Sequence, residues 1–157
     1  MATRKPFAPV ACVVGFHHAR GPEIEKWYGV EDGSDPAVEN DWSFLPFMAL
    51  SDGAHAYATL PSGLQGFIHC THTSVRSIED FSYFTLRQQG TPERPPISLF
   101  GISCTRQLDA NELIIRPDDV TRSTVQKALV VIMDSPQSFG QIREKLSIVT
   151  QAWFEQR

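Results

Sequence analysis

The sequence predicts an α+β domain in which a mostly antiparallel sheet of five strands packs against a short helix and a long C-terminal amphipathic helix. Five segments are rich in β-branched or aromatic residues, and glycine or proline separates most of them. A segment near the C-terminus instead carries apolar residues at the spacing of a helix. With 157 residues, 41% of them hydrophobic, the chain can bury one sizeable core, so we expect a single domain over residues 1–157.

The first two strands are expected to form a hairpin. Residues 9–16 are a β-branched run without helical spacing, which is typical of an interior strand buried on both faces. A polar turn with Gly21 and Pro22 leads to a second strand at residues 23–28. Strict alternation divides that strand into two faces, with Ile24 and Tyr28 on one and Glu23, Glu25 and Trp27 on the other.

An acidic stretch follows the hairpin and is expected to be a solvated loop, because glycine and proline interrupt its carboxylates: Glu31, Asp32, Asp35, Glu39 and Asp41. Pro46 predicts a helix of one or two turns within the apolar segment 44–50, since proline suits a first helical turn. We expect the aromatic residues of this region in the core or in a lid: Trp42, Phe44 and Phe47. Residues 58–77 show no sustained period and are expected to be an irregular loop insertion.

Three more strands complete the predicted sheet, at residues 81–86, 97–104 and 128–133, the last within a segment that begins at residue 124. The prolines in residues 90–96 indicate a loop, which makes the first two of these strands a hairpin. Gly101 is expected at a bulge or at a close approach of another stretch of backbone. Residues 109–113 have the composition of one helical turn.

The C-terminal helix is predicted to begin at Ser138, whose hydroxyl would cap it, with Gln141 completing a capping box. Its apolar residues step by three and four and would form one buried stripe: Phe139, Ile142, Leu146, Val149 and Trp153. Burial of each such side chain contributes roughly 1.5–3 kcal/mol before entropy. We therefore expect this helix to pack on the sheet.

Composition excludes several classes of partner and compartment. The net charge of −4 gives no electrostatic footprint for a phosphate backbone, so nucleic acid is not an expected partner. Three cysteines, at 12, 70 and 104, form no disulfide framework and indicate a reducing compartment. The apolar run at residues 10–16 is too short to cross a membrane, and no cleavage site follows it. The sequence therefore predicts a cytoplasmic protein without a transmembrane segment.

Motifs for common catalytic chemistry are missing. The chain has no P-loop, no Gly-x-Gly-x-x-Gly and no nucleophile elbow, so phosphoryl and acyl transfer are not expected. The adjacent carboxylates Asp118 and Asp119 are interpreted as structural. We expect no cofactor, no metal and no catalytic residue.

Histidine and cysteine offer one metal hypothesis. His69, Cys70 and His72 would meet in a turn, but a structural zinc site needs four protein ligands, and His55 would be a distant fourth. Cys70 with a neighbouring histidine is also a hypothetical thiol nucleophile, although nothing marks an oxyanion hole. A polar loop is the simpler interpretation of these residues.

Five blocks of sequence, in order, resemble the N-terminal region of the Avl-type late secretory pathway proteins of the DENN superfamily. They lie at residues 13–21, 45–55, 99–108, 116–127 and 146–155, and include Val-Gly-Phe-His-His-Ala-Arg-Gly and Leu-Pro-Phe-Met-Ala-Leu-Ser-Asp-Gly. The resemblance implies a longin-like fold, the upstream part of a DENN module. It also implies partners: the remaining DENN lobes of the same protein and a Rab-type small GTPase bound by the complete module. A homodimer is a further hypothesis that does not come from the resemblance.

The resemblance further implies a role in late secretory traffic from the Golgi to the plasma membrane, at the periphery of Golgi or secretory vesicles. Members of the superfamily promote nucleotide exchange by remodelling the GTPase rather than by covalent chemistry. Since the family continues beyond Arg157, exchange by this chain alone is not expected. His17, His18 and Arg20, at the hairpin turn, are the candidate contact residues.

Two other functions stay open at this point. One is a free-standing longin-type adaptor that binds a peptide or a SNARE-like helix on an open face. The other is a small zinc- or thiol-dependent enzyme that uses His69, Cys70 and His72.

Overall fold

The computed structural model describes residues 6–50, 78–109 and 124–155, in which five strands form one antiparallel sheet of order β2-β1-β5-β4-β3. The strands are β1 (Val10–His17), β2 (Gly21–Tyr28), β3 (Ile78–Gln88), β4 (Ile97–Asp109) and β5 (Thr124–Met133). The helices are α1 (Pro36–Glu39), α2 (Leu45–Ala49) and α3 (Phe139–Glu155), with a 3₁₀ turn η3 (Pro136–Ser138) before α3. The predicted longin-like α+β fold is confirmed.

Several strands of the sheet are longer than the sequence indicates, and its central strand is the last one in the chain. The three C-terminal strands all extend beyond their predicted ends, and β5 occupies the middle of the sheet. The β1 strand is interior, as expected, because it pairs with both β2 and β5. The expected helical turn at residues 109–113 begins at the last residue of β4, and its remaining residues lie outside the described ones, as do Asp118, Asp119 and the loop at 58–77.

The predicted faces of β2 are wrong because a bulge interrupts its alternation. The register shifts between Val13, which pairs with Lys26, and Val14, which pairs with Ile24, so β2 has one extra residue there. As a result, Ile24 and Trp27 both pack against the same core, and Tyr28 is half exposed. The extra residue is Glu25, whose carboxylate bonds to the Lys127 ammonium at 2.7 Å.

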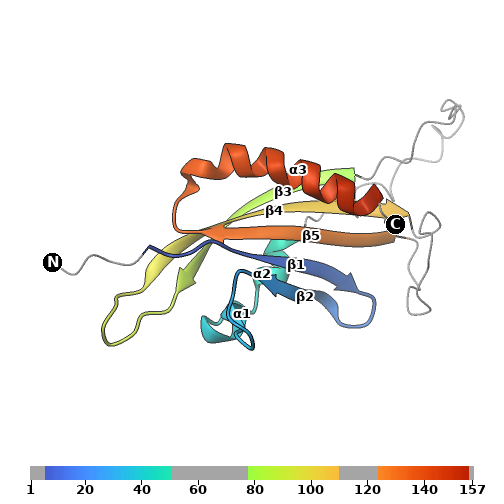
Figure 1. Cartoon of the computed structure of the whole chain (residues 1–157). Coiled ribbons are helices and arrows are strands. Elements are labelled where there is room, and N and C mark those ends of the chain that lie inside the picture. The colour runs from blue at the N-terminus through green and yellow to red at the C-terminus, as the bar shows by residue number, and fades with distance from the viewer. Residues whose placement is uncertain (1–5, 51–77, 110–123, 156–157) are drawn as a thin grey trace, which may run out of the picture.

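The chain between β2 and β3 has to pass from one edge of the sheet to the other, because these two strands are the edge strands. The helices α1 and α2 lie on this path and cover one face of the sheet, whereas α3 covers the opposite face (Figure 1). The sheet is therefore the middle layer of three, with short helices on one side and a long helix on the other.

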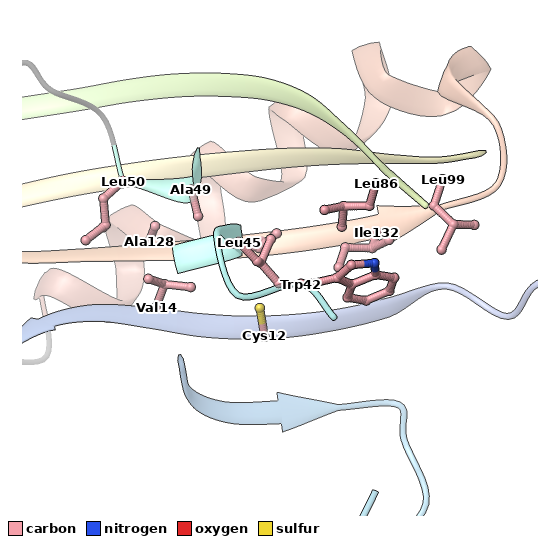
Figure 2. Close-up of a cluster of buried hydrophobic side chains, with 11 residues drawn as sticks. Cys12, Val14, Trp42, Leu45, Ala49, Leu50, Leu86, Leu99, Ala128 and Ile132 are labelled. Atoms are coloured by element: carbon pink, nitrogen blue, oxygen red, sulfur yellow. The ribbon is translucent and has the colours of Figure 1, made fainter. Parts of the chain in front are cut away.

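The larger core lies between the sheet and α2. Figure 2 shows Leu45 and Ala49 of α2, with Trp42 before them, pointing at strand residues that include Cys12 and Val14. The indole Nε1 of Trp42 donates to the carbonyl of Arg87 at 2.8 Å, so this buried ring leaves no polar atom unpaired. The predicted helix near Pro46 is confirmed, with Pro46 in its first turn.

Neither expectation for Gly101 is correct, because its strand pairs there without a bulge and the group that approaches it is a side chain, not backbone. Gly101 faces Phe84 across the β3–β4 ladder, and a Cβ atom at Gly101 would lie 2.2 Å from the Phe84 ring. The aromatic ring thus occupies the space that any larger residue would need.

The C-terminal helix has a different cap and a different buried stripe from those predicted. Its first turn is the 3₁₀ turn η3, and the hydroxyl of Ser135, not Ser138, accepts the Gln137 N–H there. Buried positions on α3 are Leu146 and Thr150, with Phe139 and Ile142 partly buried, whereas Val149 is 52% exposed. The apolar residue at 149 suggested the wrong stripe, because the side chain that completes the buried row is the threonine at 150.

A buried arginine accounts for that threonine. Arg106 of β4 donates through Nε to Thr150 Oγ1 at 2.8 Å and through a terminal nitrogen to the Ser147 carbonyl at 2.9 Å. The same guanidinium forms an ion pair with Glu79 of β3, which also accepts from the Ser147 hydroxyl at 2.6 Å. These bonds join β3, β4 and α3 through one network, which we call the Arg106 network.

Candidate interaction surface

The β1–β2 turn holds the three residues that the sequence singled out. His17 Nδ1 accepts hydrogen bonds from the backbone N–H groups of Ala19 and Arg20, at 3.1 and 3.2 Å. The His17 and His18 rings stack, with centroids 4.6 Å apart and planes 22° apart. In a continued strand these two side chains would point to opposite faces, but β1 ends at His17 and the chain turns at once. The turn therefore brings the two imidazoles together.

The Arg20 side chain forms an ion pair with Glu23 in the same turn. Its Nε and a terminal nitrogen donate to the two carboxylate oxygens of Glu23, both at 2.8 Å. The hydrogen bond from Arg20 is the main cause that lowers the pKa of Glu23, with the charges of Arg20 and His17 adding to it. Because both side chains are exposed to solvent, this pair fixes the shape of the turn more than it stabilises the fold.

Metal binding finds no support within the described ranges. Among residues 6–50, 78–109 and 124–155, no three histidine, cysteine, aspartate or glutamate side chains group in a way that could hold a metal ion. The hypothetical zinc or thiol residues lie outside the described residues: His55, His69, Cys70 and His72.

The two described thiols are buried and poorly suited to nucleophilic chemistry. Burial, with a smaller contribution from the nearby charge of Asp35, raises the pKa of Cys12 to about 12. Burial also raises the pKa of Cys104, against a smaller lowering by its hydrogen bond with Thr150. A thiol that stays protonated at neutral pH is a weak nucleophile, so both cysteines act as small apolar core residues.

The segment between β2 and β3 forms a second candidate surface, which sequence reasoning placed wrongly. Trp42 is buried as expected, but Phe44 and Phe47 are 72% and 61% exposed. Val38 of α1 is 78% exposed. We call the exposed side chains of Val38, Phe44 and Phe47 the α1–α2 surface. The helical spacing of 44 and 47, opposite the buried 45, 46 and 49, was the signal that places these two rings outside.

The acidic stretch before this surface is also more ordered than predicted. Residues 36–39 form the helix α1, and the Asp35 carboxylate caps it by accepting the N–H groups of Ala37 and Val38. The same oxygen accepts the Trp27 indole N–H at 3.2 Å. A proline at the first helical turn and an aspartate before it were the signals for this helix.

A cavity of 370 Å³ lies between β2 and the loop that leads into α1. Its walls include Trp27 and Val30 together with four carboxylates and one ammonium, those of Glu25, Glu31, Asp32, Asp35 and Lys26. The cavity is therefore polar and, by formal charge, negative.

No helix among the described residues has the length and apolar character needed to cross a membrane. The model of a family described as transport protein Avl9 matches residues 8–62 and 64–157. The late secretory pathway protein AVL9 of Saccharomyces cerevisiae is 43% identical over 160 residues, which cover 92% of this chain and 18% of that protein. The late secretory pathway protein avl9 of Schizosaccharomyces pombe is 45% identical over 146 residues, which cover 91% of this chain and 24% of that protein. No solved structure matches the chain significantly.

Proposed function

The chain belongs to the Avl9 family of transport proteins, and on that premise we propose that it is a non-catalytic longin-like module of a DENN-type regulator of Rab-like small GTPases in late secretory traffic. The observation that carries this proposal is the family match, which extends over almost the whole chain. The module works by presenting surfaces to other proteins at the periphery of Golgi or secretory vesicles.

The chemistry of the described residues supports a binding role. Both described thiols have raised pKa values, and the exposed Arg20 is already paired with Glu23. Catalysis by side chains needs a nucleophile or base with an activating partner in a protected site. Guanine nucleotide exchange needs none of these, because it works by remodelling the switch loops of the GTPase.

The chain spans 18% and 24% of the lengths of the two curated relatives, so the GTPase-binding surface is proposed to be shared with further lobes. In this proposal the β1–β2 turn is one contact of that shared surface. His17, His18 and Arg20 project from the same turn and are held in one arrangement by the contacts described above.

Binding and exchange assays test the proposal directly. Immobilised chain and an immobilised full-length relative are each exposed to a panel of nucleotide-free Rab-type GTPases, and release of fluorescent GDP is followed. We expect selective GTPase binding by the relative, weaker binding by the chain, and exchange by the relative alone. His18→Ala with Arg20→Ala should lower binding, whereas Glu144→Ala, on the solvent side of α3, should not. Failure of both proteins to bind any GTPase would refute the proposal.

A metal measurement addresses the enzymatic alternative. We expect no stoichiometric zinc in protein purified without chelators. Zinc at one equivalent that is lost in both His69→Ala and Cys70→Ala would overturn the non-catalytic assignment, since those residues would then form a real site.

A second candidate, an adaptor that binds a peptide or helix, is favoured by one specific observation. Phe44 and Phe47 expose two aromatic rings on one turn of a helix whose other side is buried. This role is compatible with the first, since a regulator can also hold its partner proteins.

A further inference from the structure

We propose that the α1–α2 surface docks a cationic amphipathic helix of a partner protein. The inference rests on the proposed function of the chain as a protein-binding module, and it adds a surface and the chemistry of its partner. Isolated exposed apolar residues are ordinary on protein surfaces. Two phenylalanines on one helical turn, with an exposed valine on the preceding helix, are a more concentrated apolar feature.

The backbone that carries these rings is held firmly. Leu45 and Ala49 of α2 are fully buried, and the Ala49 carbonyl accepts hydrogen bonds from two buried hydroxyls of β4, Ser103 at 2.6 Å and Thr105 at 3.0 Å. At the other end, the Asn40 side chain accepts the Gln89 N–H at 3.0 Å. The rings are therefore displayed on a fixed support, which lowers the ordering cost of binding.

The turn between α1 and α2 adds a sign of constraint. Asp41 has a φ of 58°, in the left-handed region that non-glycine residues rarely adopt. Such a conformation persists only where its surroundings fix it. The next residue, Trp42, is buried in the core, and Phe44 is exposed.

Charge identifies the kind of occupant. From Gly29 to Leu50 the chain has five carboxylates and no lysine, arginine or histidine. Within the described part of the chain, none of those carboxylates forms a salt bridge. Three of them, Glu31, Asp32 and Asp35, line the cavity beside β2. Glu39 and Asp41 lie in the chain between Val38 and Phe44, so the segment that displays the apolar side chains is itself acidic. Such a segment is complementary to a helix that carries apolar residues on one face and lysine or arginine beside them.

The same charge argues against other occupants. A second copy docked through this surface would bring two acidic segments together, which is unfavourable. An anionic membrane would repel the carboxylates instead of attracting them. A basic amphipathic helix is the occupant that can bury the two phenylalanine rings and also offer positive charge to the acidic segment.

Selection from a displayed library of random 16-residue peptides tests the proposal. We expect the chain to enrich peptides with apolar residues at helical spacing and several lysines or arginines. Phe44→Ser combined with Phe47→Ser should lower the affinity for the enriched peptides at least tenfold, as measured by fluorescence anisotropy, since aromatic anchors dominate such contacts. Glu31→Lys combined with Asp32→Lys should lower the affinity for the same peptides about three- to tenfold at low salt, and less at high salt. Both variants should keep the melting temperature within a few degrees, because none of the four side chains is buried.

The matched control is Ile148→Ser, which removes an equally exposed apolar side chain (68%) from α3 and should leave binding unchanged. No enriched peptides, enriched peptides without basic residues, or equal binding by the Phe44→Ser, Phe47→Ser variant would each overturn the inference. So would a dimer in sedimentation, or attachment to phosphatidylserine vesicles, that this double variant abolishes. GTPase binding by the full-length relative would leave the proposed function standing in all these cases.

Discussion

On one face of the sheet, α1 and α2 meet a large apolar cluster, and on the other, α3 meets a small apolar cluster joined to a buried arginine. The first includes Leu45, Leu99 and Ile132, all fully buried. The second has Ile102, Cys104 and Leu146 as its buried members among the described residues, and the Arg106 network lies beside it. Short helices are thus held by burial, and a long helix is held partly by hydrogen bonds and charge.

This difference separates helix length from helix stability. One-turn helices such as α1 and α2 would not form alone in water, because nucleation is unfavourable. Here their stability comes from tertiary contacts, so they form a fixed platform. The 17-residue α3 is longer, yet several of its apolar side chains stay exposed, such as Ile148 and Val149.

The largest expected effect compares one leucine from each face. Leu45→Ala should lower the free energy of unfolding by about 3–5 kcal/mol, and Leu146→Ala by about 2–3 kcal/mol, because the cost rises with the cavity left in a well-packed core. Urea denaturation measures both, with Phe44→Ala as a control that should change the value by less than about 0.5 kcal/mol. A larger loss at Leu146 than at Leu45 would break the comparison.

The next effect tests the charge that holds α3. Arg106→Leu should destabilise the chain by about 1–3 kcal/mol, because Glu79 and Thr150 lose their shared partner. Adding Glu79→Leu should recover part of the lost stability, since the double variant no longer leaves a carboxylate beside an apolar site. Additive losses in this double-mutant cycle would show that the Arg106 network does not act as a unit.

Alkaline pH provides a third test, on the α2 face. The pKa of Cys12 is raised to about 12, above its ordinary value of 9.0. A raised pKa stabilises the fold below the ordinary value, and this stabilisation is lost as pH rises toward the folded value. We therefore expect the free energy of unfolding to fall from about pH 9 upward, by at most about 1.4 kcal/mol per pH unit for this thiol. The decline should be shallower in Cys12→Ala, and an identical decline in both proteins would contradict the burial of this group.

The smallest effect concerns an ion pair that belongs to neither face. In Arg20→Ala the pKa of Glu23 should return toward its ordinary value, which carboxyl chemical shifts in an NMR titration would report. A lowered carboxyl pKa stabilises the fold above the ordinary value and loses that effect as pH falls through the lowered one. Thermal unfolding near pH 7 should hardly change, because both side chains are exposed. A marked loss of stability would show that the turn is coupled to the core.

Sequence patterns predicted the elements of the fold and missed the details that depend on tertiary contacts. Periodicity placed the β-rich segments and the C-terminal helix correctly, because each pattern reflects which face is buried. It assigned Trp27 to the wrong face of β2, since a bulge at Glu25 cannot be read from alternation. It also preferred Val149 over Thr150, because the arginine that makes a threonine suitable there comes from a distant strand.

The candidate site could be predicted only in part. The β1–β2 turn was found from its residues, but the stacking of His17 on His18 depends on where β1 ends. Phe44 and Phe47 were expected in the core or in a lid. Their exposure follows from the side of α2 that packs on the sheet, which the short apolar segment leaves ambiguous.

Hydrogen exchange at the amides of α1 and α2 tests most directly the claim that these short helices are a fixed platform. The N–H groups of Trp42, Leu45 and Met48 donate to the carbonyls of Ala37, Trp42 and Phe44, at 2.8, 3.0 and 3.0 Å. If tertiary burial fixes the platform, these amides should exchange as slowly as those of β1, and Leu45→Ala should speed them selectively. Exchange at nearly the rate of an unstructured peptide, while β1 stays protected, would contradict the account.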